Sequence, residues 1–261
     1  MVERQAAFSQ LKSLTEIDLA NPTTVRSGGL AMEDLILHGP LLEGINLEQE
    51  LGNDTAVKLQ QLYEKFETDL EYDFAERIIK GEATMTEYPL YQRFQRLIQA
   101  EIKLASITDK DKVLFIGSGP FPISPILVSQ LTSARVDCFD QSEQPASVSE
   151  KVIQKLDLTE RIRIFNASGD IRRIYGYDVV MLALLAQPKY EILYNTQWSI
   201  PQGTRVICRT SEDGRQAFYK PTDPATYRSI GRYQLVGKHT AGIDDTISSL
   251  LFRIDGRPEN R

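Results

Sequence analysis

Histidine, cysteine and tryptophan are scarce in this chain of 261 residues, which holds two histidines, two cysteines and one tryptophan. Because the sequence has no cluster of cysteine and histidine, it offers no zinc site, and we expect no bound metal. Cys138 and Cys208 lie inside apolar runs typical of buried strands, so we interpret both as core residues of a reduced protein. The isolated His38 and His239 are interpreted as surface or loop residues.

The sequence also lacks long apolar runs and basic runs. No segment approaches the roughly 18 apolar residues that a membrane helix needs, and the first ten residues lack the basic and then apolar pattern of a signal peptide. The net charge is −6 and the pI is about 5.2, so the chain repels phosphate backbones on average. We therefore expect a cytoplasmic protein with neither a membrane nor a nucleic acid as its partner.

Residues 1–106 are predicted to form an N-terminal helical domain. Between residues 53 and 80, apolar side chains recur at spacings of three and four, which is the pattern of one apolar helix face. They are Leu59, Leu62, Tyr63, Phe66, Leu70, Phe74 and Ile78. Gly81 is typical of a helix end. Further helices are expected over 3–19, 31–50 and 91–104, with breaks at Asn21-Pro22, Gly28-Gly29 and Gly39-Pro40.

Short apolar strands alternate with helices in residues 107–261. This alternation predicts right-handed βαβ units and a parallel sheet, and two final strands joined by a loop predict an antiparallel pair at one edge. The fold class is therefore α/β. The arrangement is Rossmann-like and resembles the fold of methyltransferases that depend on S-adenosylmethionine (SAM). The strands are expected at 112–116, 135–140, 162–166, 178–182, 205–209, 233–238 and 247–254.

A G-x-G segment, Gly117 to Gly119, follows the first strand and opens a helix. Glycines there allow a ligand to approach the backbone closely, although the same segment is also compatible with an ordinary tight turn. A dinucleotide fingerprint needs a third glycine at position 122, where this chain has Pro122. SAM carries no phosphate and does not need that glycine, so the segment favours SAM as the ligand.

Acidic and small residues follow the other strands at the same edge of the predicted sheet. Asp140 ends the second strand, about twenty residues after the glycines, where an acid commonly accepts hydrogen bonds from the ribose. Asp140 could instead cap a helix, and Asp170 either accepts from the adenine or belongs to a turn. The residues expected to hold SAM are Gly117, Ser118, Gly119, Pro120, Asp140, Asn166, Ala167, Asp170, Ala183 and Leu185.

Three segments of the chain resemble the nicotianamine synthase family. They are FIGSGPFPISPILVSQ at 115–130, MLALLAQPKYEIL at 181–193 and RVICRTSEDGRQAFY at 205–219. The A-x-x-A-x-P-K stretch and the R-T pair are the specific parts, and the resemblance covers about residues 55–255. It is greatest to the archaeal and bacterial members, which include the bacterial branch whose enzymes make histidine-based opine metallophores of the staphylopine, pseudopaline and yersinopine type.

This resemblance implies an unusual use of SAM. The enzymes of this branch transfer its 3-amino-3-carboxypropyl group (aminobutyrate) to the α-amine of histidine and release 5′-methylthioadenosine. An opine dehydrogenase then consumes the product, and the resemblance also implies a homodimer. Three alternatives stay open: a nicotianamine-type synthase with repeated transfers, a small-molecule methyltransferase, and a SAM-binding module without catalysis.

The transfer needs a base, because an α-amine is largely protonated at neutral pH. The resemblance places Glu71 on the catalytic glutamate of the family, whereas the residues alone make it one of several acids on a helix surface. A Y-x-x-Y element likewise places Tyr91 on the catalytic tyrosine, with Tyr88 binding substrate, although Tyr91 could equally be a core aromatic. Lys189 and Arg209 are expected to bind substrate carboxylates. Lys189 could instead begin a helix, and Arg209 could instead form a salt bridge across the sheet edge.

Overall fold

The computed structural model describes residues 2–167 and 175–256, and their contacts divide the chain into two compact units. The first unit comprises Met1–Leu70, Thr210–Pro221 and Thr240–Ser248. The second comprises Glu71–Arg209, Thr222–His239 and Ser249–Arg261. The second unit of this division begins at Glu71, whereas the sequence places the domain boundary after residue 106.

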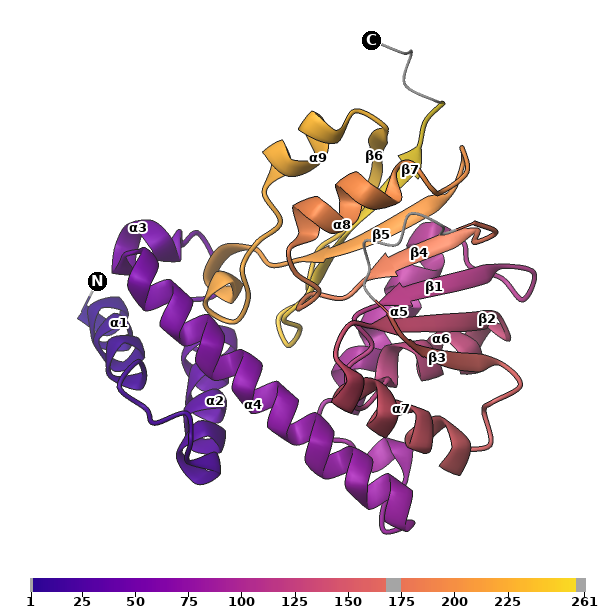
Figure 1. Ribbon diagram of the computed structural model, residues 1–261. Helices are drawn as coiled ribbons and strands as arrows, with labels where there is room; N and C mark the ends of the chain where they lie inside the picture. The colour runs from indigo at the N-terminus through magenta and orange to yellow at the C-terminus, as the bar shows by residue number, and fades with distance from the viewer. Residues whose placement is uncertain (1, 168–174, 257–261) are drawn as a thin grey trace. The chain divides into compact units, whose positions relative to one another are not determined.

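The described strands of the second unit form one sheet in the order β3-β2-β1-β4-β5-β7-β6 (Figure 1). Strands β1 to β5 run parallel, and β6 pairs antiparallel with β7, as the sequence predicts. The strands are β1 (Lys112–Ile116), β2 (Arg135–Asp140), β3 (Ile162–Asn166), β4 (Val179–Leu182), β5 (Arg205–Thr210), β6 (Tyr233–His239) and β7 (Ser248–Ile254). The sequence therefore located every described strand to within one residue at either end.

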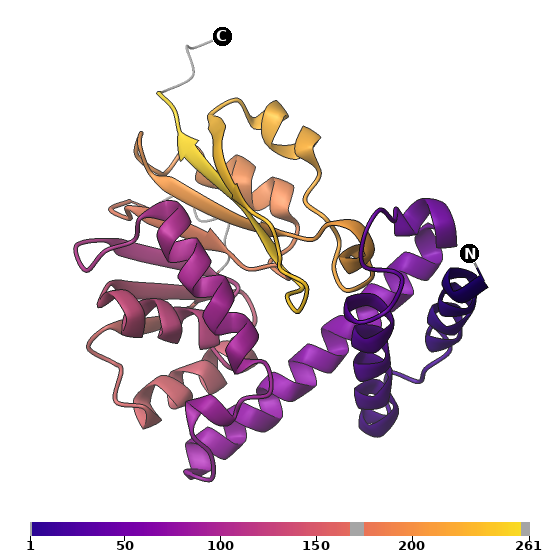
Figure 2. The same cartoon turned by 180° about the vertical axis from the view of Figure 1, so that it is seen from behind.

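Helices cover both faces of this sheet (Figures 1 and 2). Helices α5 and α6 pack on each other on one face, and α8 and α9 pack on each other on the opposite face. The helices of this unit are the end of α4 (Asn53–Lys80), η1 (Met85–Glu87), α5 (Tyr91–Ala105), α6 (Ile123–Thr132), α7 (Glu143–Lys155), α8 (Lys189–Thr196) and α9 (Pro224–Ile230). Cys138 and Cys208 are free and fully buried, as expected of core residues.

The first unit contains α1 (Val2–Leu14), α2 (Pro22–Leu37), α3 (Leu47–Leu51), the start of α4 and η2 (Asp213–Ala217). Two hydrogen bonds from buried tyrosines to glutamates join its elements. The Tyr63 hydroxyl donates to Glu33 Oε1 over 2.5 Å, and the Tyr219 hydroxyl donates to Glu67 Oε1 over 2.6 Å. None of the described helices, in either unit, has the length and apolar character to cross a bilayer.

The helix breaks expected at Asn21-Pro22 and Gly39-Pro40 agree with the bounds of α2, but the break expected at Gly28-Gly29 is wrong. Both glycines lie inside α2, which ends at Leu37. A Cβ on Gly29 would lie 2.3 Å from the ring of Phe66, and a Cβ on Gly28 would lie 2.5 Å from Ile17. The glycine pair is therefore a contact surface for α4 and the chain before α2, not a breaker.

Candidate functional site

The strand order reverses between β1 and β4, because β2 and β3 lie on one side of β1 and β5 lies beyond β4. In open α/β sheets, ligands bind outside the carboxyl ends of the strands at such a reversal. Here the segment after β1 begins at Gly117, and the segment after β4 begins at Ala183, whose N–H donates to Ile116 O over 3.0 Å. The fold alone thus selects these two segments.

The turn after β1 has the backbone conformation that glycine adopts most readily. Gly117 has a φ of +84° and Gly119 a φ of +66°. A Cβ on Gly117 would lie 3.1 Å from the Cβ of Ala186 and 3.2 Å from that of Ala183, so the turn packs directly on the segment after β4. The segment after β1 and the segment after β4 are therefore in direct contact.

The turn brings Glu71 and Asp140 to the same place. A Cβ on Gly119 would lie 2.6 Å from Glu71 Oε2, so the carboxylate lies against the backbone of this residue. The N–H of Gly119 donates to Asp140 Oδ2 over 2.9 Å, and Ser142 N–H donates to Oδ1 over 3.0 Å. The predicted base, the G-x-G turn and the predicted ribose ligand thus meet at Gly119.

The residues of this turn are compatible with a bound polar ligand. Ser118 is 6% exposed, and its hydroxyl has no hydrogen-bond partner among the described residues. Buried hydroxyls are usually satisfied, so an unpaired one beside a glycine turn is typical of a ligand site. Pro120 is buried after the turn, and α6 begins only at Ile123.

Strand β3 ends next to Asp140. Asn166 pairs with Asp140 in the sheet register, and its side-chain Nδ2 donates to Asp140 O over 3.1 Å. Ala167 N–H donates to the same carbonyl oxygen over 2.8 Å. Both residues therefore lie directly beside Asp140, while Asp170 lies outside the described residues. Leu185, after β4, is 39% exposed and available to a ligand.

The Y-x-x-Y element begins α5. Tyr88 is 2% exposed, and its ring centroid lies 5.1 Å from that of Phe74 and 4.9 Å from that of Phe121. Tyr91 is half-buried, and its N–H donates to Tyr88 O over 2.9 Å. The ring of Tyr88 thus belongs to an aromatic cluster that joins α4 to the segment after the G-x-G turn.

Lys189 and Arg209 have partners within the protein. The Lys189 ammonium donates to Leu184 O and to Ala186 O. The Arg209 guanidinium donates through Nε and Nη2 to the two oxygens of Glu101, each over 2.9 Å, and both residues are buried. The salt bridge that the sequence left as the alternative for Arg209 is therefore present, in the core and not at a sheet edge.

Tyr72 lies near Glu71 and Asp140, and the sequence did not indicate it as a candidate. Burial raises the pKa of its hydroxyl, and the nearby carboxylates of Asp140 and Glu71 raise it further. The hydroxyl therefore stays protonated near both acids and can donate a hydrogen bond there. Periodicity could not have found Tyr72, because adjacent residues on a helix face different directions.

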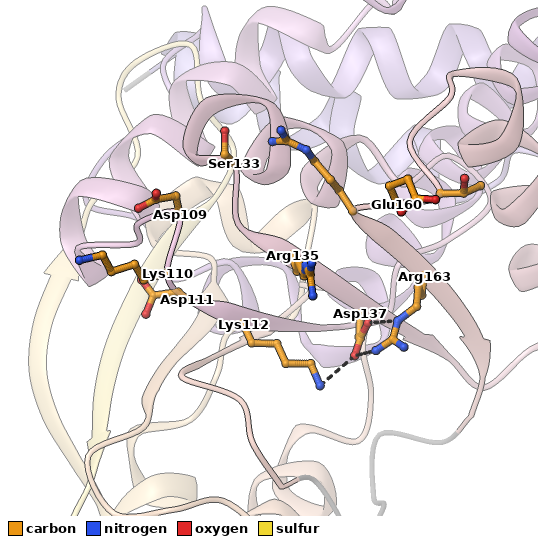
Figure 3. Close-up of a pocket in the computed structure, with 11 residues that line it drawn as sticks. Asp109, Lys110, Asp111, Lys112, Ser133, Arg135, Asp137, Glu160 and Arg163 are labelled. Carbon is orange, nitrogen blue, oxygen red and sulfur yellow. Dashed lines mark hydrogen bonds and ion pairs between the residues drawn. The ribbon is translucent and has the colours of Figure 1, made fainter.

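A polar cavity of about 810 Å³ lies at the amino ends of β1, β2 and β3, away from the G-x-G turn. Figure 3 shows Asp137 between Lys112 and Arg163, with dashed lines to both. Burial would raise the pKa of the Asp137 carboxyl, but hydrogen bonds from Arg163 and Tyr177, with the charges of Arg163 and Lys112, outweigh it and lower the pKa. We interpret Asp137 as the centre of a structural ion pair that joins the first three strands.

The sheet order and the reversal site define the Rossmann-like fold of SAM-dependent transferases. A family model described as nicotianamine synthase protein matches residues 38–254, so the chain belongs to the nicotianamine synthase family. This confirms the family that the three motif segments indicated.

Curated relatives are distant. The chain is 23% identical over 128 residues to an L-histidine 2-aminobutanoyltransferase of Yersinia pestis, covering 49% of this chain and 48% of the relative. It is 24% identical over 130 residues to the enzyme of that name in Pseudomonas aeruginosa, covering 49% of each. It is 23% identical over 181 residues to nicotianamine synthase 1 of Oryza sativa subsp. japonica, covering 64% and 54%. The matches thus span about half the length of these relatives.

Solved structures agree with the fold over nearly the whole chain. A glutamate-to-glutamine variant of MtNAS in complex with S-adenosylmethionine superimposes with a TM-score of 0.85 at 22% identity, covering 96% of this chain and 98% of that one. MtNAS in complex with MTA and tNA gives a TM-score of 0.83 at 23% identity, covering 97% of both. At this identity the likeness establishes the fold.

We expect Gly119→Ala to weaken binding of SAM and to slow turnover, because the new methyl group would displace the Glu71 carboxylate. Gly44→Ala is a matched control, since Gly44 has the same φ of +66° with nothing within 4 Å of an added Cβ. Both variants should lose stability through backbone strain of about 1–2 kcal/mol, but only Gly119→Ala should lose affinity. Calorimetric titration with SAM measures this, and equal affinities for the two variants would contradict it.

Asp140→Ala is expected to lower SAM affinity about 10- to 100-fold, as when a hydrogen bond to a charged group is removed. Two effects combine, because the variant loses the ribose acceptor and frees the N–H of Gly119 from its partner. Asp109→Ala is a suitable control, since Asp109 is an exposed acid at the opposite, amino end of the strands. A SAM affinity of Asp140→Ala within twofold of the unmodified protein would refute the ribose role.

Proposed function

We propose that this protein transfers the 3-amino-3-carboxypropyl group of SAM to the α-amine of histidine and releases 5′-methylthioadenosine. The observation that carries the proposal is the position of Glu71. Its carboxylate lies against Gly119 of the G-x-G turn, and the N–H of Gly119 binds Asp140. A base is thus adjacent to the segment that would hold the donor. A module that only binds SAM would not need such a base.

The chemistry assigned to Glu71 is proton removal. SAM supplies an electrophilic carbon beside its sulfonium and a neutral thioether leaving group. Glu71 takes the proton from the α-amine, the amine nitrogen forms a bond to that carbon, and the carbon–sulfur electron pair stays on sulfur. Because the geometry of the bound donor decides which carbon reacts, the rigid turn at Gly117 and Gly119 selects the transferred group.

The remaining site residues bind and orient. We assign Asp140 to binding the ribose of SAM, and residues 117–120 to contacting SAM through their main chain. Asn166 and Ala167 would line the adenine side of the site, and Ala183 and Leu185 the sulfonium side. Tyr91 assists Glu71, and Tyr88 lines the acceptor side. Substrate contacts through Lys189 and Arg209 are not part of this mechanism, because backbone carbonyls and Glu101 occupy their polar groups.

Histidine as acceptor is favoured by the bacterial relatives named L-histidine 2-aminobutanoyltransferase. The equally similar plant nicotianamine synthase makes a synthase with repeated transfers the second candidate. With histidine, we assign the enzyme to the cytoplasmic synthesis of an opine-type metallophore, upstream of an opine dehydrogenase, and expect a homodimer. The metal belongs to the finished product.

Mass spectrometry of reactions with SAM and L- or D-histidine tests the proposal. The expected products are methylthioadenosine and histidine enlarged by one aminobutyrate unit, and the productive tube identifies the stereoisomer. Methylthioadenosine together with acceptors that carry several units would favour the nicotianamine-type synthase. S-adenosylhomocysteine would mean methylation, and SAM binding without any product would mean a binding module; either result would overturn the proposed transfer.

A further inference from the structure

A buried lysine stands at the start of α8, directly behind the segment that follows β4. Lys189 is 5% exposed, although its side chain ends in an ammonium. Its Nζ donates to Leu184 O and lies 3.4 Å from Ala186 O. Buried lysines are rare because desolvation of the charge is costly, so their hydrogen bonds determine the local structure.

The carbonyls that Lys189 binds belong to the segment packed on the G-x-G turn. A Cβ on Gly117 would meet the Cβ of Ala186 at 3.1 Å and that of Ala183 at 3.2 Å. Ala183 N–H is held by Ile116 O at the end of β1. The segment is therefore fixed at its start by the sheet and at its end by the ammonium, and a shift of Leu184 or Ala186 would move the surface against Gly117.

We propose that Lys189 is a positioning residue that fixes the segment after β4 against the G-x-G turn and thereby shapes the sulfonium side of the donor site. This inference rests on the proposed function for the identity of the donor. Lys189 acts through the backbone of residues 184–186 and does not itself contact the reacting atoms.

The electrostatics of Lys189 give this role a measurable pH dependence. Burial lowers its pKa to about 8, a negative charge on Cys208 would oppose this shift, and the positive charge of Arg209 adds to it. Within the described part of the chain, Cys208 and Arg209 of β5 are the charged or titratable groups that act on Lys189. Burial raises the pKa of Cys208, so it stays a neutral thiol without a charge. Above this pH, Lys189 becomes a neutral amine, a weaker donor to the carbonyls than an ammonium.

Ligand affinity and fold stability should then respond to pH in opposite directions. The folded state binds the Lys189 proton less tightly than an unfolded chain does, because lysine in an unfolded chain has its ordinary pKa of 10.5. The unfolded state therefore carries more protons between the two values, and this group makes stability rise with pH in that window. Affinity should fall in the same window, because the hydrogen bonds to the segment weaken.

Calorimetric titration with 5′-methylthioadenosine from about pH 7 to about pH 9 tests the proposal, because this probe has no amino acid group that titrates there. We expect the affinity of the unmodified protein to fall several-fold through about pH 8. Lys189→Met should bind about tenfold more weakly at the lower pH, as expected for lost hydrogen bonds to a charged donor, and its affinity should not change with pH. Lys151→Met, on an exposed lysine of α7, is the matched control.

The outcomes separate the two proposals. A flat pH profile in the unmodified protein, or an unchanged affinity in Lys189→Met, would overturn the positioning role, and the first of these needs no variant to fold. Stability that falls together with affinity above pH 8 would show unfolding and would also overturn it. Binding of the probe without product in the mass-spectrometric assay would reject the transferase function and leave the role of Lys189 standing.

Discussion

Glu71→Gln is expected to release methylthioadenosine about 10²- to 10⁴-fold more slowly than the unmodified protein, the usual contribution of a positioned base. Glutamine keeps the shape of the side chain against Gly119 but cannot take the proton of the α-amine. SAM affinity should therefore change little. Single-turnover formation of methylthioadenosine gives the rate, and calorimetric titration with SAM gives the affinity.

Glu64→Gln controls for the loss of an acid on the same helix, because Glu64 is an exposed residue of α4. Its rate should equal that of the unmodified protein. The slow variant should also recover partly at high pH, where the free α-amine no longer needs a base. A Glu71→Gln rate within about threefold of the unmodified protein would remove the catalytic role, since a base normally contributes far more than that.

Glu101→Gln is expected to lower the free energy of unfolding by about 3–5 kcal/mol, as when one partner of a buried ion pair is removed. Glu101 is fully buried on α5 and accepts from Arg209 of β5 and from Ser249 of β7, which donates over 2.6 Å. The guanidinium also reaches Ser124 of α6 over 3.1 Å. The substitution leaves the charge of Arg209 unpaired in the core, and urea denaturation measures the effect.

Two further variants show that this loss arises from the buried charge. Glu76→Gln breaks an exposed pair with Lys80, 2.6 Å long, and should change the stability little, because water screens surface pairs. The double variant Glu101→Leu with Arg209→Met should recover much of the stability, since no charge is then left unpaired. If Glu101→Gln were as stable as the unmodified protein, the pair would not support the core.

The parallel strands were predictable because each is a short apolar run between turn signals, and a parallel sheet buries both faces of such runs. Helix α4 was predictable from its long apolar periodicity. The short helices α3 and α9 have too few residues to show an apolar periodicity. Helix α2 was misplaced because the glycines within it resemble a helix break, and the residues that these glycines contact lie elsewhere in the sequence.

The candidate site was predictable where its chemistry follows strand ends. Gly117, Gly119 and Asp140 were placed by position after β1 and β2, and the structure brings them together with Glu71. Lys189 and Arg209 show the limit of this reasoning. Their charge suggested substrate carboxylates, but only the fold shows that Leu184 and Glu101 are within reach.

Because of its glycine pair, helix α2 depends for its stability on packing against neighbouring segments. Each glycine costs about 1 kcal/mol of helix propensity relative to alanine, so the isolated segment has little tendency to be helical. Gly29 provides the space for the Phe66 ring, and Gly28 provides it for Ile17 and Leu62. Helix α2 would therefore form in folding only when α4 docks, and its amide protons should exchange with solvent together with those around Phe66, as one cooperative unit.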